Sequence, residues 1–213
     1  MKRTCFSLFL ILVSVLALSA QDFAVDSLHS GDLLFVYSTE PNAITEVTEG
    51  WEGAAVDHVG IAVRDSGETG NLTVLEAVHK GVVFTPLDSF LLHNSHEGVP
   101  TVLVGRVTCS VDIPASIANA ARQLGKPYDF YFMPDDKAFY CSELVQKSYV
   151  DVSGHRIFNP IPMSFHDRSG KIISYWKDYY SRAGLTVPEG ADGSNPGDLS
   201  RNGKVKILGR LHR

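Results

Sequence analysis

The stretch DHVGIAVR (residues 57–64) is followed, after a polar loop, by LTVLEAV (residues 72–78). In the first stretch, branched apolar residues alternate with small or polar ones, and a period of two is typical of a strand with one buried face. The second stretch has the composition of a strand, and the loop 65–71 is rich in residues that favour turns. The sequence therefore predicts a β-hairpin over residues 57–78.

One predicted face of this hairpin carries polar groups. His58 shares its face with Gly60 and Ala62, two small residues that leave space beside the imidazole and favour a confined site for a short ligand. With the turn centred in the loop, His58 lies opposite Val78, and Glu76 is its diagonal neighbour. A carboxylate in that place fixes the tautomer of a histidine and stabilises its charged form. The alternative is structural: a hydrogen-bonded strand histidine and a surface carboxylate.

Further strands and a few helices extend outward from the hairpin. Apolar runs predict strands, and stretches with helical spacing bounded by Pro or Gly predict helices. The predicted strands cover residues 33–37, 81–85 and 101–108, and the predicted helices cover 41–52, 86–93, 114–124, 138–150 and 170–183. Because the strands follow one another and pair locally, the chain of 213 residues is expected to form one α+β domain with an antiparallel sheet.

A cysteine lies near the start of the predicted helix 138–150, in the stretch FYCSELV (residues 139–145). Cys141 falls in the first turn, where unpaired backbone N–H groups and the helix dipole favour a thiolate and can hold an oxyanion. Cys141 is thus a candidate nucleophile. Two alternatives remain, a small core residue or a disulfide with Cys109, the one other cysteine beyond the N-terminal segment.

The N-terminal segment has the pattern of a signal peptide. Lys2 and Arg3 precede the uncharged run 6–18, and small residues end at Ala20. The run is shorter than the about 20 residues that a membrane-spanning helix needs, so we expect export with cleavage after Ala20 and no stable insertion in a membrane. The formal net charge of −5 argues against a nucleic-acid partner.

The other polar motifs are weaker. His93 and His96 are spaced like a metal pair, yet no clear ligand set surrounds them, and His79 is a rival base at a strand end. Phosphate-binding glycine loops and the Gly-x-Ser-x-Gly motif are absent from the sequence. We therefore expect neither a metal nor an organic cofactor.

Five motifs together resemble a known family. They are GDLLF (residues 31–35), DHVGI (57–61), VLEA (74–77), GKPYD (125–129) and YCSELV (140–145). In this order they resemble the YiiX/YebB-like branch of the NlpC-type papain-like superfamily in its circularly permuted form, in which the histidine precedes the cysteine. The resemblance runs from about residue 28 to 165.

The resemblance implies a papain-like α+β fold in which a Cys-bearing helix packs on an antiparallel sheet. It implies Cys141 as nucleophile, His58 as base and Glu76 as the residue that orients the imidazole. It also makes a disulfide less expected and Cys109 an ordinary buried strand residue. We expect the hydrolase domain to cover residues 21–185, followed by a loosely held tail, 186–213.

The expected function is hydrolysis of an amide bond in short peptides outside the cytoplasm, with cell-wall peptides as first candidates. Tyr128 and Asp129, before the Cys helix, are candidates for holding a substrate amine; the alternative is that they only anchor their loop. Two other functions stay open. A lipid-directed acyltransferase or thioesterase of the same fold would need an apolar groove, and a binding module would have lost the activity.

Overall fold

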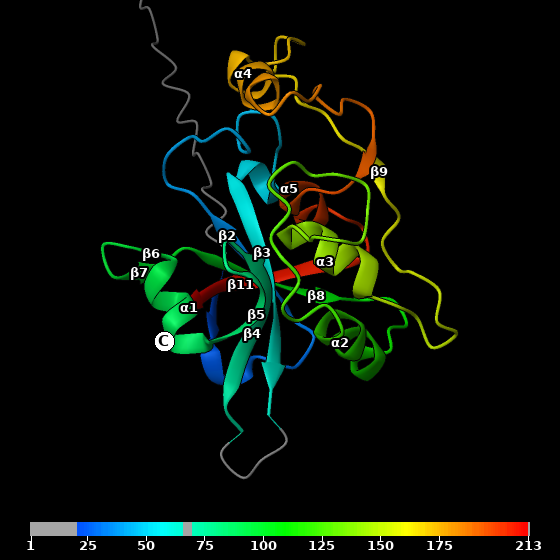
Figure 1. The fold of residues 1–213 in the computed structure, drawn as a ribbon. Coiled ribbons are helices and arrows are strands. Elements are labelled where there is room, and N and C mark those ends of the chain that lie inside the picture. Colours follow the sequence, from blue (N-terminus) through cyan, green and yellow to red (C-terminus); the bar gives the residue numbers. More distant parts are fainter. Residues whose placement is uncertain (1–20, 66–69, 213) are drawn as a thin grey trace, which may run out of the picture.

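A seven-stranded sheet runs through the computed structural model, which describes residues 21–65 and 70–212 (Figure 1). In spatial order its strands are β1 (Asp22–Ala24), β11 (Val205–His212), β8 (Val102–Val107), β2 (Leu33–Tyr37), β3 (Val56–Arg64), β4 (Leu72–Val78) and β5 (Gly81–Pro86). Neighbouring strands are antiparallel, except that β1 runs parallel to β11. The predicted hairpin 57–78 is confirmed as β3 and β4.

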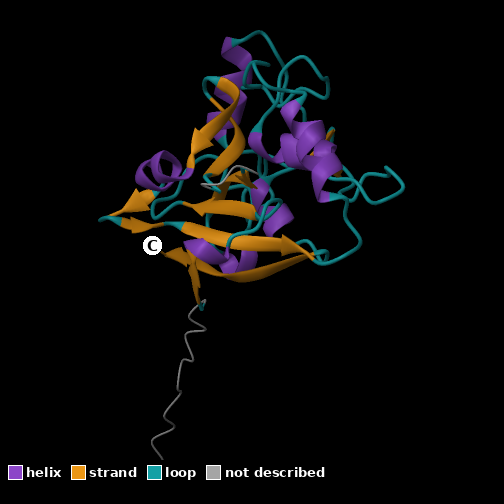
Figure 2. Cartoon of the chain, turned by 90° about the horizontal axis from the view of Figure 1, so that it is seen from below, coloured by secondary structure: helices purple, strands orange, loops and turns teal. Residues whose placement is uncertain are grey.

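Helices cover both faces of the sheet (Figures 1 and 2). On one face α1 (Leu87–His93) packs against residues such as Leu34 and Ala62. On the other face lie α2 (Ile113–Ala121), α3 (Cys141–Ser148) and α5 (Pro196–Ser200), whose side chains share a core with Leu33 and Phe35. Because both faces are buried, β2 is a continuous apolar run rather than an alternating one.

A third apolar cluster lies past one end of β3, around α4 (Ser174–Arg182) (Figure 1). It contains the buried residues Met163, Phe165, Trp176 and Tyr180. The short strands β9 (Ile161–Pro162) and β10 (Asp192–Gly193) pair beside it. The remaining short elements are β6 (Ser95–His96), β7 (Val99–Pro100) and the 3₁₀ turns Val25–Ser27 and Trp51–Gly53.

The α+β class is confirmed, and so are most predicted elements, with helix ends shifted by a few residues. The helix expected over 41–52 is wrong: the segment forms turns followed by the 3₁₀ turn at its end. The reason is local. Asn42 Oδ1 accepts hydrogen bonds from the backbone N–H groups of Ile44 and Thr45, and such a side chain offers the backbone an alternative to a helix.

The segment beyond residue 185 is part of the fold, and the expectation of a loosely held tail is wrong. β11 inserts between β1 and β8, with Val205 opposite Val107 and Ile207 opposite Gly105. At Gly209 the strand bulges so close to the backbone of Gln21 that a side chain would clash. The Gly- and Pro-rich stretch before this strand hides its short apolar alternation, so composition alone gave the wrong expectation.

The predicted signal peptide, residues 1–20, lies outside the described residues. Across 21–65 and 70–212, none of the helices has the length and apolar character to cross a membrane.

Candidate active site

The imidazole of His58 and the carboxylate of Glu76 form a pair across β3 and β4. His58 Nε2 lies 2.7 Å from Glu76 Oε2, as their predicted diagonal placement requires. Glu76 is almost fully buried, with 5% of its surface exposed, so this contact is shielded from water. The hairpin register, in which Ile61 faces Leu75, brings the two side chains to the same face.

The small residues beside His58 have a different role from the one expected. A Cβ atom at Gly60 would overlap the side chain of Val74 and lie 3.4 Å from Glu76 Cβ. Ala62 is fully buried in the core that includes α1. These positions therefore make room for the neighbouring strand and helix, and the expectation that they leave open space for a ligand is wrong.

Thr85 is a member of this cluster that the sequence did not indicate. Its hydroxyl donates a hydrogen bond of 2.6 Å to Glu76 Oε1, the carboxylate oxygen that does not face His58. Thr85 lies on β5, opposite Val74 of β4. Both oxygens of Glu76 are thus engaged, which fixes the plane of the carboxylate.

Cys141 is the first residue of α3, as predicted. The residue before it, Tyr140, caps the helix without a side-chain hydrogen bond, so no side chain competes for the N–H groups of the first turn. Cys141 is 4% exposed and packs in the core between α3 and the sheet. Both cysteines within the described residues are free, and Cys109 is exposed rather than buried. The disulfide alternative and the buried placement of Cys109 are therefore wrong.

His58 and Cys141 interact through their side chains. Burial alone would lower the pKa of His58, but hydrogen bonds and charge interactions with Cys141 and Glu76 raise it from 6.5 to about 10. Since Nε2 faces Glu76, the other ring nitrogen, Nδ1, is left for Cys141. This order of three groups favours a protonated imidazole next to Cys141.

A cavity that is partly open to solvent lies against Cys141. Its lining is mostly apolar and comes from segments far apart in the sequence. The lining residues are Ile44, Val47, Thr48, Asp57, Tyr128, Phe132, Tyr140, Cys141, Ser142, Met163, Ser164, Phe165, Trp176, Ser194, Asn195 and Pro196. The segment beyond residue 185 thus contributes to the site.

A second cleft adjoins the cavity and reaches His58. Its lining includes Asn42, Asp57 and His58 together with several aromatic side chains. Asp57 lies at an irregularity of the β2–β3 pairing, where the register shifts between Val36 opposite His58 and Tyr37 opposite Val56. Such a bulge re-aims side chains. Because a bulge cannot be located from the period of a strand, Asp57 and Asn42 were not predicted as site residues.

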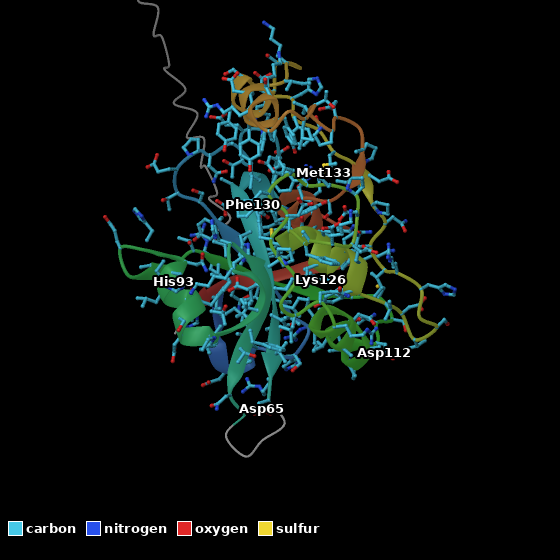
Figure 3. The ribbon with its side chains drawn as sticks, viewed as in Figure 1. Asp65, His93, Asp112, Lys126, Phe130 and Met133 are labelled. Atoms are coloured by element: carbon cyan, nitrogen blue, oxygen red, sulfur yellow. The ribbon has the colours of Figure 1, made fainter. Side chains whose placement is uncertain are left out.

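The two predicted substrate-binding residues have different surroundings. Tyr128 lines both the cavity and the second cleft, and burial raises the pKa of its hydroxyl. Asp129 accepts hydrogen bonds from the backbone N–H groups of Tyr131 at 2.9 Å and Met133 at 2.5 Å. Its carboxylate therefore anchors the loop that carries Phe130 and Met133 past the end of β3 (Figure 3), which favours the alternative role.

The histidines considered as a metal pair are His93 and His96. His93 belongs to α1 and lines a further cleft that also borders His58 and Glu76. Within residues 21–65 and 70–212, no three His, Cys, Asp or Glu side chains are grouped so that they could hold a metal ion.

Known proteins with similar sequences or folds identify the family of this chain. A family model for the permuted papain-like amidases YaeF/YiiX, family C92, matches residues 27–208. YiiX from Escherichia coli (strain K12) is 34% identical over 131 residues, and the chain covers about 60% of that protein's length. A crystal structure of YiiX from Escherichia coli O157:H7, described as a metalloprotein, matches with a TM-score of 0.67 and 25% identity over 85% of this chain and 97% of that one.

The family model covers most of the chain, including Cys141, His58 and Glu76 and the segment beyond residue 185 that completes the sheet. The chain belongs to the YaeF/YiiX family of permuted papain-like amidases, family C92.

Proposed function

We propose that this chain is a cysteine hydrolase that cleaves an amide bond, with Cys141 as nucleophile, His58 as acid and base and Glu76 as the residue that orients the imidazole. The observation that carries the proposal is the order of the three side chains, a helix-terminal thiol next to an imidazole whose far nitrogen is held by a buried carboxylate. This is the arrangement that nucleophilic catalysis by a thiol requires.

In the proposed reaction, Cys141 Sγ attacks the substrate carbonyl carbon as a thiolate, and the carbonyl becomes an oxyanion. Backbone N–H groups in the first turn of α3 stabilise that charge. His58 then donates its proton to the leaving amine, and the C–N bond breaks to leave a thioester on Cys141. A water molecule, deprotonated by His58, hydrolyses the thioester and regenerates the thiol.

Short peptides outside the cytoplasm are the first substrate class in this proposal, with cell-wall peptides ahead of others. Export rests on the sequence of residues 1–20. N-terminal sequencing of protein recovered from the medium or the cell envelope tests it, and the expected mature chain begins at Gln21.

A second candidate function is transfer or hydrolysis of an acyl group on a lipid or thioester. One observation favours it: the cavity against Cys141 is lined mostly by apolar and aromatic side chains, such as Ile44, Phe165 and Trp176. An apolar groove is the feature that a lipid substrate needs, and it favours the second candidate over the first.

The experiment incubates the mature protein with short cell-wall peptides and, separately, with acylated lipids and acyl thioesters. The proposal predicts release of a free amine from peptides and loss of that release in Cys141→Ser. Turnover of lipids or thioesters with no peptide cleavage would replace the first candidate by the second. No turnover of either, together with an unreactive Cys141, would favour a binding module.

No metal takes part in the proposed steps. A solved relative is described as a metalloprotein, but the donor side chains that the structure describes in this chain do not converge into a metal-binding set. We expect activity to survive dialysis against a chelator.

A further inference from the structure

The carboxylate of Asp57 lies beside the reacting groups, and the proposed mechanism gives it no role. It is half-buried, precedes His58 in the chain, and lines both the cavity next to Cys141 and the cleft next to His58. A ligand that bridges these two spaces passes Asp57.

The position of this carboxylate is fixed by a neighbouring turn. Asn42 Nδ2 donates a hydrogen bond of 2.6 Å to Asp57 Oδ2, while Asn42 Oδ1 accepts from the backbone N–H groups of Ile44 and Thr45 at 3.0 and 3.1 Å. These acceptor contacts set the orientation of the Asn42 amide, so its NH₂ group points at Asp57. The carboxylate is therefore held in place before any ligand arrives.

Asp57 has His58, the next residue in the chain, as a charged neighbour but forms no ion pair. None of the ion pairs formed by the described residues includes it. Burial raises its pKa, and the hydrogen bond from Asn42 and the charge of His58 lower it only in part. A partly desolvated carboxylate that forms no ion pair is costly, and a cationic ligand would lower that cost.

Aromatic rings form the walls around this carboxylate. Among the described residues lining the cleft, Asp57 is the single acidic side chain and His58 the single basic one. The aromatic residues of the lining are Tyr128, Phe130, Phe132, Tyr175, Trp176 and Tyr179. The faces of such rings attract ammonium groups. The carboxylate and the aromatic walls therefore both favour a positively charged ligand.

We propose that Asp57 binds an ammonium group of the substrate, held against this aromatic wall next to the carbonyl that Cys141 attacks. The inference rests on the proposed function and specifies its substrate as a cationic molecule. It gives to Asp57 the role that the sequence suggested for Asp129, whose carboxylate is occupied by its own loop. A purely structural role, anchoring the turn at Asn42, is the competing explanation.

The test compares two small thiol reagents that differ in charge, 2-aminoethyl methanethiosulfonate, a cation, and 2-hydroxyethyl methanethiosulfonate, which is neutral. Each forms a mixed disulfide with Cys141 and releases methanesulfinate. The protein carries Cys109→Ser, because Cys109 is exposed and would also react. Rates at Cys141 are followed by mass spectrometry, and the measured quantity is the ratio of the cation rate to the neutral rate.

The variant is Asp57→Asn, which keeps an oxygen to accept the hydrogen bond from Asn42 and removes the charge. We expect the ratio to fall about fivefold to tenfold in Asp57→Asn, as loss of a nearby charge at a partly desolvated site implies. Glu46→Gln is the matched control, because it removes a charge from an exposed position near the same turn and outside both linings. Its ratio should stay that of the parent.

A second measurement needs no variant: the ratio in the parent protein should fall as salt is added, because salt screens the attraction. Equal ratios in the parent and Asp57→Asn, or equal slowing of both reagents, would leave Asp57 a structural role and overturn the inference. The proposed function would stand in that case, since Cys141 still reacts. If neither reagent modifies Cys141 in the parent, the proposed function fails and the inference with it.

Discussion

The residues on the two sides of Cys141 are positioned in different ways. His58, Glu76 and Thr85 lie on three adjacent strands, and hydrogen bonds of 2.6 and 2.7 Å connect them. The wall of the cavity comes instead from loops and from α4, with Tyr128 and Trp176 among its members. The sheet holds the reacting groups through its register, while the wall depends on contacts between distant segments.

The difference separates two tasks. Sheet register leaves little freedom, which suits groups that must meet a reacting atom within a few tenths of an ångström. Loops tolerate substitution and insertion better, which suits the choice of substrate. Variants on the strands should therefore change the rate of the chemical step, and variants on the wall should change substrate binding.

The largest effect is expected for the two reacting residues. Cys141→Ser and His58→Ala should each lower kcat by at least about a thousandfold, because each removes a group that forms or protonates a bond. Circular dichroism should match the parent protein for both variants, and thermal melting should match it for Cys141→Ser. A Cys141→Ser protein that keeps more than a few per cent of the activity with an unchanged melt would contradict the mechanism.

Glu76→Gln should lower kcat by about a hundredfold, less than the loss of His58. The amide can still contact the imidazole but no longer stabilises its charged form. Steady-state kinetics over a range of pH measures the effect, and KM should change little. An unchanged kcat would mean that another group orients His58.

Thr85→Val should lower kcat by about tenfold, because one oxygen of Glu76 loses its hydrogen bond and the carboxylate gains freedom to turn. Thr73→Val is the control, since the Thr73 hydroxyl donates to the backbone oxygen of Val63 rather than to the site. Thr85→Ser should restore most of the rate. Equal effects of the Thr85→Val and Thr73→Val substitutions would show that only strand packing is being measured.

On the wall, Tyr175→Ala should raise KM about fivefold and leave kcat nearly unchanged. Tyr175 is 51% exposed, lines the cleft and stacks on Tyr179, so its removal costs contact with the ligand more than it costs the core. A drop in kcat with a constant KM would contradict the idea that residues of the wall act on substrate binding alone.

The smallest effect concerns stability. The pKa of His58 is raised from 6.5 to about 10, so its protonated form adds stability that is fully present below pH 6.5 and is lost as the pH rises towards 10. Urea unfolding of the parent at a series of pH values should show this loss relative to His58→Gln. Parallel curves for the two proteins would mean that His58 is neutral in the fold.

Sequence reasoning succeeded where the pattern is local. The period of two over 57–64 located His58, and helical spacing located Cys141 at the start of α3, so the central pair and the carboxylate at Glu76 were predicted. It missed Thr85, because its contact depends on the register of a third strand, and Asp57, because a bulge changes its direction.

The same limit explains the errors further along the chain. The position of β11 depends on partners in β1 and β8, which a local pattern cannot show. Residues such as Ser194 reach the cavity only because that strand and α5 hold their segment against the sheet. Asp129 was expected in the site because its loop precedes the Cys helix, yet its carboxylate accepts hydrogen bonds from the backbone of that loop.

The position of β11 in the sheet also determines when the sheet can be completed during synthesis of the chain. β8 leaves the ribosome long before β11 is made, and β1, at the edge of the described sheet, pairs with β11 alone. Until residues 205–212 have been added, β8 carries an open edge of the kind that joins with other chains, and β1 has nothing to pair with. The sheet therefore depends on a strand that is made late. A nascent chain that ends before β11 contains Cys141 and His58 but has an incomplete sheet.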